Sequence, residues 1–311
     1  MESKPTEPLV SILTPYYKLG DLLIETVQSV LAQTYQNWEL IIVDDCSPVS
    51  PAEAVLANFN DPRIKIFRHE ENRGNAAARN TAALHSTGEL LLPLDSDDLL
   101  APNYITATLK VMLENEVSAV HTDVQIFGMH SYVYKPSANL GDIISGHYPH
   151  NTFLMKREVY DAVGGYKNIR AIVDTEFWIS ILEIGTKFAY LPEPLYFYRR
   201  HADSWSQNCK SLEVEFLKVL LQHLDSTKEH LPRMLEGMIR NANNQKYKSN
   251  QKPSRRERYE LLHKEFHDLL QRYESLEKKV ERTEHVLASL PKSSRQFAYV
   301  ALKKLGLRTS S

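Results

Sequence analysis

Strand-like apolar runs alternate with helical patterns along the first 130 residues. The runs that predict β-strands are VSILTPYY (10–17), ELIIVDD (39–45), RIKIFRH (63–69) and ELLLPLD (89–95). The helical patterns lie at 22–33, where Asp21 is the expected cap, near 51–59, at 75–87 and at 102–115. Strands that alternate with helices need crossover connections, which produce a mostly parallel sheet flanked by helices on both faces. We therefore predict an α/β fold.

Polar residues stand where three of the predicted strands end. They are Thr14 and Tyr16 on the first strand, Asp44 and Asp45 on the second, and Asp95, Ser96, Asp97 and Asp98 on the fourth. The carboxyl ends of parallel strands meet at one edge of such a sheet, where ligands bind. Helix capping explains one of the last three acids, but crowded carboxylates repel unless a cation or hydrogen-bond donors neutralise them. The sequence therefore predicts a ligand site at this edge.

An aspartate-rich loop at a strand end suits a divalent cation. Mg²⁺ and Mn²⁺ bind through one or two carboxylates, and diphosphate oxygens and water complete the shell. The chain contains neither GxxxxGK[ST] nor GxGxxG, which argues against a P-loop and a dinucleotide-binding fingerprint. A nucleotide would therefore be held by another device.

The middle of the chain has an α+β pattern. Paired strands are predicted at 118–128 and 131–136, and a loop with Gly and Pro residues at 137–151. The last three elements are a strand and helix within 152–166 closed by Gly164 and Gly165, a helix at 174–185, and a strand at 187–201.

The texture changes after about residue 210 to charged helix. A heptad seam is formed by Leu262, Phe266, Leu269, Tyr273, Leu276, Val280, Thr283, Leu287 and Leu290. It predicts a coiled coil, with a homodimer as the expected assembly; the alternative is one amphipathic helix lying on the preceding domain. The basic end of the chain either lies on an anionic membrane surface or packs as a tail. The expected divisions are a tail 1–8, an α/β domain 9–208, a helical connector 209–254, a coiled coil 255–290 and a basic amphipathic tail 291–311.

Composition narrows the functional classes. A net charge of -2 argues against a nucleic-acid-binding protein. Two cysteines, Cys46 and Cys209, provide neither a disulfide framework nor a zinc spacing. The start of the chain does not resemble a signal peptide, and no apolar run approaches the ~20 residues of a spanning helix. We expect a cytoplasmic protein, free or held at a membrane surface.

Five stretches resemble a known enzyme family. They are VSILTPYYKLGDLLIETVQSVLAQTYQNWELIIVDDCS, NRGNAAARNTA, GELLLPLDSDDLLAP, VGGYKNIRAIVDTEFWISIL and YRRHADSWS, within residues 8–205. In this order they are similar to the family 2 glycosyltransferases, inverting enzymes of the GT-A (Rossmann-like) fold. The resemblance implies a nucleotide-sugar donor, a hydroxyl acceptor and a divalent metal, Mn²⁺ or Mg²⁺. The acceptor expected for the family is a glycan or a lipid-linked precursor.

The resemblance also implies roles for individual residues. Those implied to bind the nucleotide sugar are Thr14, Tyr16, Asp45, Arg73, Arg79, Asp95 and Ser96. Tyr16 would stack near the base or ribose, Asp45 would accept the base imide N–H, and an arginine would reach the phosphates or support the loop. The structural alternatives are a surface turn for Tyr16, a turn cap for Asp45 and solvated side chains for the arginines. Asp95 is implied to reach the ribose or to support its loop.

Metal and acceptor residues follow in the later stretches. Asp97 and His201 are the implied metal ligands, with Arg199, Arg200 and Ser204 beside His201. Asp98 is interpreted as a cap of the next helix. Asp174 aligns with the family's general base, although a helix N-cap is the local alternative and Val173 replaces the usual first acid. Glu176 and Trp178 are candidate acceptor residues. For Trp178 the alternative is packing. His121 and Asp123 lie near the presumed acceptor side or are structural.

These roles predict an inverting transfer of a sugar to a hydroxyl, with residues 137–151 closing over the donor to exclude water. Two alternatives remain: a sugar nucleotidyltransferase, and a weakly active or inactive scaffold that acts through the coiled coil. The identities of the donor, the acceptor and the linkage do not follow from the sequence.

Overall fold

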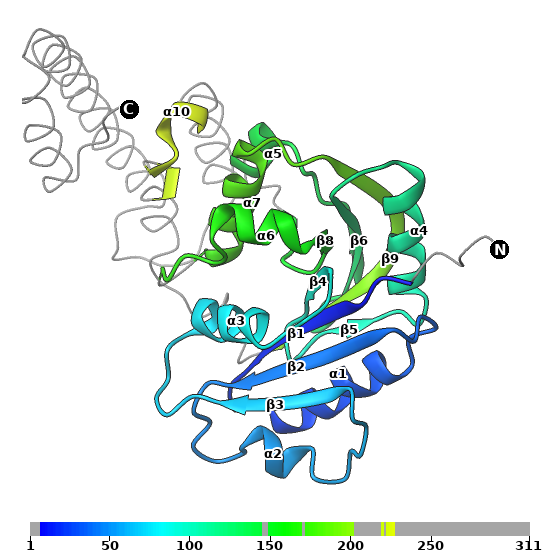
Figure 1. Ribbon diagram of the computed structural model, residues 1–311, viewed down its shortest axis with the longest axis vertical. Coiled ribbons are helices and arrows are strands. Elements are labelled where there is room, and N and C mark those ends of the chain that lie inside the picture. The colour runs from blue at the N-terminus through cyan, green and yellow to red at the C-terminus, as the bar shows by residue number, and fades with distance from the viewer. Residues whose placement is uncertain (1–6, 145–148, 170–171, 202–218, 221, 228–311) are drawn as a thin grey trace, which may run out of the picture. The chain divides into compact units, whose positions relative to one another are not determined.

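The computed structural model describes residues 7–144, 149–169, 172–201, 219–220 and 222–227 (Figure 1). The chain divides into two compact units, Met1–Leu231 and Pro232–Ser311, and all described residues belong to the first. The predicted coiled coil 255–290, the tail 291–311, Ser204 and most of the connector 209–254 lie outside the described residues. Within the described residues no helix is long and apolar enough to cross a membrane.

One sheet runs through the described part of the first unit, in the order β3-β2-β1-β4-β8-β6-β9-β5 with β7 beside β6. The strands are β1 (Val10–Tyr16), β2 (Trp38–Asp44), β3 (Ile64–Arg68), β4 (Leu90–Pro93), β5 (Leu99–Leu100), β6 (Ala119–Gly128), β7 (Tyr132–Tyr134), β8 (Leu154–Lys156) and β9 (Phe188–Arg200). The four predicted strands of the N-terminal half are parallel to one another. The C-terminal half is mixed, because β8 is antiparallel to both β4 and β6 whereas β6 and β9 are parallel. The fold class is confirmed as α/β, and only the first half fits a parallel sheet.

Helices cover both faces of this sheet (Figure 1). They are α1 (Gly20–Leu31), α2 (Ala52–Val55), α3 (Asn75–Leu84), α4 (Tyr104–Glu114), α5 (Leu140–Ile144), α6 (Arg157–Val163), α7 (Val173–Glu183) and α10 (Leu224–Thr227). Val10 and Ile12 of β1 share a core with Leu23 and Val27 of α1. Helix α3 instead buries a stripe of alanines on β1 and β2. Alanines let this helix lie close to the sheet and bring its polar side chains to the strand ends.

Several element ends differ from the sequence prediction. Asp21 lies in the first turn of α1 and does not cap it, since Leu19 is the N-cap residue. Asp98 does not cap the next helix either, because β5 intervenes and α4 begins after Asn103. Helix α3 ends at Leu84, before the predicted end at residue 87. A Cβ at Gly88 would come within 2.5 Å of the Leu9 carbonyl oxygen, so this glycine permits close approach to β1.

Other elements agree with the prediction. Strands β6 and β7 pair as an antiparallel hairpin. Helix α6 ends at Gly164 in the left-handed conformation, with φ 74°. Helix α5 forms within the predicted loop 137–151, and residues 145–148 of that loop lie outside the described residues. Closure of this loop over a donor stays a prediction.

Candidate functional site

The register of the parallel strands places their polar ends at one edge. Tyr16 is aligned with Asp44, and Asp44 with Arg68. Asp44 binds groups close to it in the fold. Its carboxylate accepts hydrogen bonds from the amides of Ser47 (2.7 Å) and Ala52 (3.0 Å) and forms an ion pair with Arg68 (2.9 Å). Asp44 therefore shapes the turn after β2.

Asp45 holds the start of α3. Its carboxylate accepts the backbone N–H groups of Arg73 (2.8 Å) and Gly74 (2.7 Å), and it lies 2.7 Å from Nδ1 of His69. Gly74 has φ 88°, a conformation that favours glycine. The loop leaves the Arg73 side chain exposed. Asp45 thus fixes the entry to α3 and leaves Arg73 accessible to an anion.

Arg79 joins two acids that are far apart in the sequence. It projects from α3, is 1% exposed, and places its guanidinium nitrogens 2.6 Å from Asp95 and 2.6 Å from Asp174. With its amide oriented to satisfy its neighbours, Asn151 accepts from Arg79 Nε at 3.0 Å and donates to the Tyr166 hydroxyl at 2.8 Å. A planar guanidinium is suited to bridging two carboxylates in this way. Arg79 lies buried beneath the acids, so it does not face the phosphates of a ligand.

Asp174 stands in the first turn of α7. The N-cap residue is Ile172, in the left-handed conformation with φ 55°, and no side chain caps the helix. The alternative interpretation of Asp174 as a helix N-cap is therefore wrong. Its side chain is 44% exposed although Oδ1 contacts Arg79. Burial of the carboxyl raises the pKa of Asp174, and the charge of Arg79 opposes this shift. A partly exposed carboxylate with a raised pKa is what a general base needs.

Asp97 and His201 meet at the end of β9. The Asp97 Oδ2 atom lies 3.0 Å from the His201 Nε2 atom, and each side chain is 21% exposed. Burial raises the pKa of Asp97, and the charge of Asp95 acts in the same direction. One carboxylate oxygen and one imidazole nitrogen fit Mn²⁺ better than Mg²⁺, which prefers oxygen ligands. Within the described residues no group of three or more His, Cys, Asp or Glu side chains forms a complete metal site, so the remaining ligands would be diphosphate and water.

Asp98 and Arg199 hold the loop that carries Asp97. Asp98 is fully buried, accepts the backbone N–H of Arg199 at 2.7 Å and accepts the Tyr196 hydroxyl. Burial raises the pKa of Asp98 well above its usual value. The Arg199 side chain donates to the Asp97 carbonyl at 2.8 Å and pairs with Glu25 at 2.6 Å. These residues fasten the loop to β9, which fixes the position of Asp97 relative to His201.

Four of the residues predicted to contact a ligand have buried side chains. Tyr16 is 1% exposed, packs in the core and donates to the Ser50 carbonyl at 2.5 Å, so it presents no ring face to a base. Thr14 and Ser96 are also buried. Trp178 is fully buried, packs on Phe153 with ring centroids 4.3 Å apart, and is packing rather than an acceptor wall.

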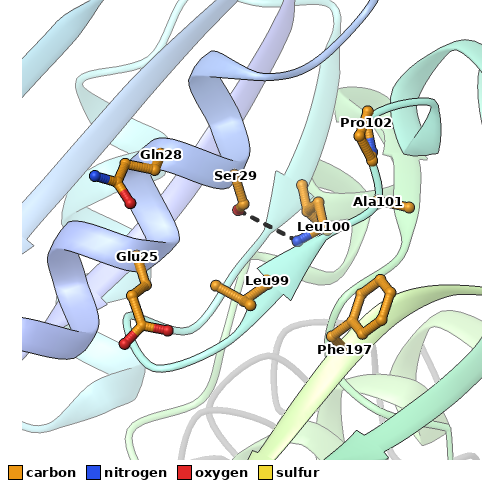
Figure 2. Close-up of a pocket in the computed structure, with 8 residues that line it drawn as sticks. All are labelled: Glu25, Gln28, Ser29, Leu99, Leu100, Ala101, Pro102 and Phe197. Carbon is orange, nitrogen blue, oxygen red and sulfur yellow. Dashed lines mark hydrogen bonds between the residues drawn. The ribbon is translucent and has the colours of Figure 1, made fainter.

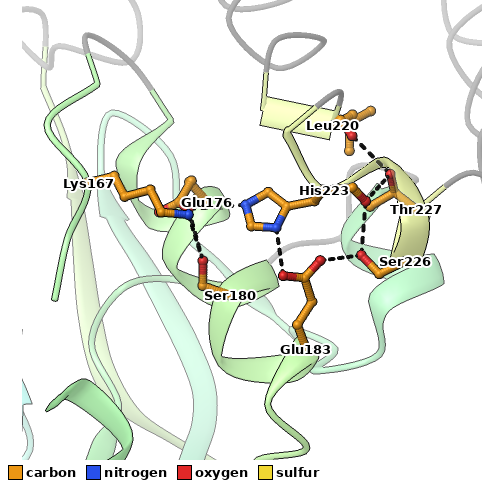
Figure 3. Close-up of polar contacts among 8 residues, drawn as sticks. All are labelled: Lys167, Glu176, Ser180, Glu183, Leu220, His223, Ser226 and Thr227. Carbon is orange, nitrogen blue, oxygen red and sulfur yellow. Dashed lines mark hydrogen bonds and ion pairs between the residues drawn. The ribbon is translucent and has the colours of Figure 1, made fainter. Parts of the chain in front are cut away.

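Glu176 lies in a buried charge cluster beneath α7, as Figure 3 shows. Its carboxylate pairs with Lys167, accepts from Ser180 at 2.9 Å and lies 3.1 Å from Nε2 of His223. Glu183 binds the other imidazole nitrogen at 2.8 Å. The predicted acceptor role of Glu176 is therefore wrong, because its side chain joins α7 to His223 and is 0% exposed.

His121 and Asp123 are structural in their contacts. Both lie on β6 and are at most 5% exposed. His121 stacks on Tyr190 with ring centroids 5.0 Å apart, and Asp123 accepts the Tyr190 hydroxyl. Burial lowers the pKa of His121 to about 4.

A pocket of about 350 Å³ lies away from these acids, between α1, β5 and β9 (Figure 2). Its lining includes Glu25, Gln28, Leu99 and Phe197, and none of the predicted site residues. Ser29 in its wall accepts the Leu100 amide at 3.3 Å.

Sequence patterns missed Asn151 and His69, which contact Arg79 and Asp45. Asn151 lies in the predicted loop 137–151, which has no periodic pattern, so no signal identifies it. His69 ends the third predicted strand, and its place at the same sheet edge was an available signal.

Comparisons with known proteins agree with this geometry. A family model described as "Glycosyl transferase family 2" matches residues 11–177. TuaG of Bacillus subtilis (strain 168), whose name places it in teichuronic acid biosynthesis as a glycosyltransferase, is 32% identical over 65% of this chain and 83% of its own length. The β-1,3-glucosyltransferase WfgD of Escherichia coli, whose name gives UDP-Glc as donor and α-D-GlcNAc-diphosphoundecaprenol as acceptor, is 39% identical over 41% of this chain and 50% of its own.

Solved structures share the fold. Residues 1–349 of Staphylococcus aureus TarS in complex with UDP-GlcNAc align with a TM-score of 0.57 and 16% identity, over 75% of this chain and 80% of that one. The mannosyltransferase PcManGT of Pyrobaculum calidifontis, in complex with GDP-Man and Mn²⁺, aligns with a TM-score of 0.57 and 18% identity, over 78% and 77% of the two chains.

Proposed function

This chain belongs to glycosyl transferase family 2 and is a glycosyltransferase, and on that premise we propose that it transfers a sugar from a nucleoside-diphosphate sugar to a hydroxyl with inversion. The observation that carries the proposal is the Arg79 bridge, which joins the base candidate Asp174 to Asp95 of the aspartate-rich loop. The same loop presents Asp97 to His201. Donor-side and acceptor-side chemistry are thereby brought into one site by residues from α3, α7, β9 and the loop after β4.

The nucleoside diphosphate would lie along the strand ends. Arg73 is exposed above the start of α3 and is available to a phosphate. Arg200 has a buried Nε without a hydrogen-bond partner among the described residues, and a buried unpaired donor is costly unless a ligand satisfies it. Asp95, 27% exposed, is positioned for the ribose hydroxyls while Arg79 holds its other side. A divalent cation bound by Asp97 and His201 would neutralise the charge of the diphosphate.

The chemical step assigned to this chain is a proton transfer. As the acceptor oxygen forms its bond to the anomeric carbon, Asp174 takes the hydroxyl proton. The bond from the anomeric carbon to the diphosphate oxygen breaks on the opposite face, and its electron pair leaves with the nucleoside diphosphate. An α-linked donor therefore gives a β-linked product. The names of relatives support a surface polysaccharide or a lipid-linked precursor as the acceptor.

Release of nucleoside diphosphate from a panel of UDP-, GDP-, dTDP- and CDP-sugars, with Mn²⁺ and with Mg²⁺, tests the proposal. Asp174→Asn should lower kcat about 10²- to 10⁴-fold while the Kd for the nucleoside diphosphate changes less than about 2-fold. Asp161→Asn is the matched control, because Asp161 is exposed on α6. Normal turnover by D174N would reject this base, and an α-linked product by NMR would reject inversion.

The metal pair is tested separately. Asp97→Ala should weaken binding of the nucleoside diphosphate in the presence of Mn²⁺ but leave binding in the presence of EDTA unchanged. Equal affinities of wild type and D97A under both conditions would place the cation elsewhere. Asp161→Ala, at the exposed acid on α6, is the control.

A further inference from the structure

The segment 150–152 passes between the metal-bearing strand and the base-bearing helix. The His150 carbonyl accepts the Trp178 Nε1–H of α7 at 3.3 Å. Asn151 contacts Arg79, which in turn binds Asp95 and Asp174. The segment is thus anchored to the same residues that organise the acids.

The His150 imidazole leans toward the carboxyl end of β9. Its ring centroid is 4.4 Å from that of Tyr198, with the planes inclined by 45°, and 5.8 Å from that of Tyr196. Tyr196 donates to Asp98, and Tyr198 lies three residues before His201. The ring of Tyr134 on β7 approaches from a third side, with centroids 5.7 Å apart. His150 remains partly exposed within this aromatic group.

The transferred sugar has to occupy the space between these two elements. Its anomeric carbon is bonded to the diphosphate, which the cation at Asp97 and His201 would hold. The same carbon is attacked by the hydroxyl whose proton goes to Asp174. The His150 imidazole packs on Tyr198 of the metal strand, and its backbone carbonyl accepts from the buried Trp178 of the base helix, so the residue lies between the two elements.

We propose that His150 hydrogen-bonds a hydroxyl group of the transferred sugar and is a specificity-determining residue of the donor site, an inference that rests on the proposed function. The partly exposed rings of Tyr134 and Tyr198 provide an apolar wall for the C–H face of the same sugar. A sequence pattern does not identify His150, because it lies in a predicted loop without periodicity.

The chemistry of the imidazole suits an uncharged partner. Burial lowers the pKa of His150 to about 4, and Arg200 acts in the same direction while Asp95 opposes it. At neutral pH the ring is therefore neutral and offers one donor and one acceptor nitrogen, which matches a sugar hydroxyl. A neutral group discriminates by the position of the hydroxyl, since it has no long-range attraction for the phosphates.

The test compares binding of a sugar nucleotide with binding of its nucleoside diphosphate. UDP-glucose, UDP-GlcNAc and GDP-mannose are titrated into the full-length chain with Mn²⁺ by calorimetry, together with UDP and GDP. His150→Phe keeps an aromatic ring on the tyrosines but removes both nitrogens, whereas His150→Gln keeps an amide donor and acceptor. His85→Phe is the matched control, because His85 is an exposed histidine that stacks on Phe67 with centroids 3.9 Å apart.

H150F should raise the Kd of the bound sugar nucleotide about 3- to 10-fold, the usual net effect of a neutral hydrogen bond, with the Kd of the nucleoside diphosphate unchanged. H150Q should recover part of the loss, and H85F should equal wild type. If H150F does not fold, H150Q is used alone. A lower affinity of H150Q for the sugar nucleotide than that of wild type supports the inference, and an unchanged affinity contradicts it.

Three results would overturn the inference. A sugar-nucleotide affinity unchanged in both variants means that His150 does not touch the sugar. Equal losses for the sugar nucleotide and the nucleoside diphosphate mean that it supports the phosphate site instead. If wild type binds no sugar nucleotide, the proposed function fails with it; binding by wild type together with unchanged variants leaves the proposed function intact.

Discussion

Arg79 makes the positions of two acids depend on one buried cation. Asp95 and Asp174 are both 2.6 Å from its guanidinium, and both carboxylates are partly exposed whereas Arg79 is not. Without the cation the two carboxylates would repel each other, and each would rotate toward solvent. Arg79 therefore acts through the residues that it holds, as a positioning residue.

We expect Arg79→Lys to lower kcat about 10- to 100-fold, because an ammonium group keeps the charge but cannot bridge two carboxylates in fixed geometry. The free energy of unfolding should fall by about 1–3 kcal/mol through lost charge-assisted hydrogen bonds. Steady-state kinetics and urea unfolding measure the two effects. Arg63→Lys, in the partly exposed pair with Asp61 before β3, is the control for kcat, which it should leave unchanged. An R79K enzyme with wild-type kcat would contradict the positioning role.

At the same scale, the sequence predicts which residues stand at strand ends but not which way they face. Asp45, Asp95 and Asp97 end runs whose apolar character is unambiguous, so their common edge follows from the parallel topology. Tyr16 and Trp178 carry polar atoms on large apolar rings, and either the core or a ligand can take such a ring. Only the packing of α1 and β8 against them decides for the core.

Helix α7 is held at both ends by charge. Its first turn carries Asp174 toward Arg79, and its opposite face carries Glu176 and Glu183 toward His223 before α10. His223 lies outside residues 11–177, which the family model matches. A part of the chain beyond this match therefore contributes contacts that hold α7 in place. Burial alone lowers the pKa of His223, but hydrogen bonds to the two carboxylates outweigh burial and raise it above 6.5.

A histidine whose pKa is raised on folding stabilises the fold fully below its unfolded pKa, and that stabilisation is lost as the pH rises through the folded value. We therefore expect His223→Gln to lower the free energy of unfolding by about 2 kcal/mol near pH 6 and by progressively less toward pH 9. Urea unfolding at a series of pH values measures this difference. His130→Gln, on an exposed histidine, should show no such trend. A difference between wild type and H223Q that grows with pH would mean that His223 is neutral in the folded protein.

The sequence does not predict the elements that form only through tertiary contacts. Strand β5 has two residues and exists because it pairs with β9, so no local pattern marks it. Helix α10 and its neighbour His223 contact α7 through hydrogen bonds from His223 and Ser226 to acids of α7, which no local pattern marks. By contrast β1 to β4 stand between helical patterns along the sequence, and the predicted parallel direction of these strands is confirmed.

At the scale of the whole molecule, the candidate site is formed by loops at the sheet edge and by β9, which come from separate parts of the sequence. A ligand that contacts all of them should stabilise the folded state by mass action. At about 100 times its Kd, a nucleoside diphosphate with Mn²⁺ should contribute about 2.7 kcal/mol and raise Tm by about 5–10 °C. Removing the cation with EDTA should abolish most of the shift. In Asp97→Ala the shift should be small with or without EDTA, whereas in Asp174→Asn it should persist, because Asp174 serves the acceptor proton and not the diphosphate. A full, EDTA-sensitive shift in the Asp97→Ala protein would show that the cation binds the folded chain through other residues.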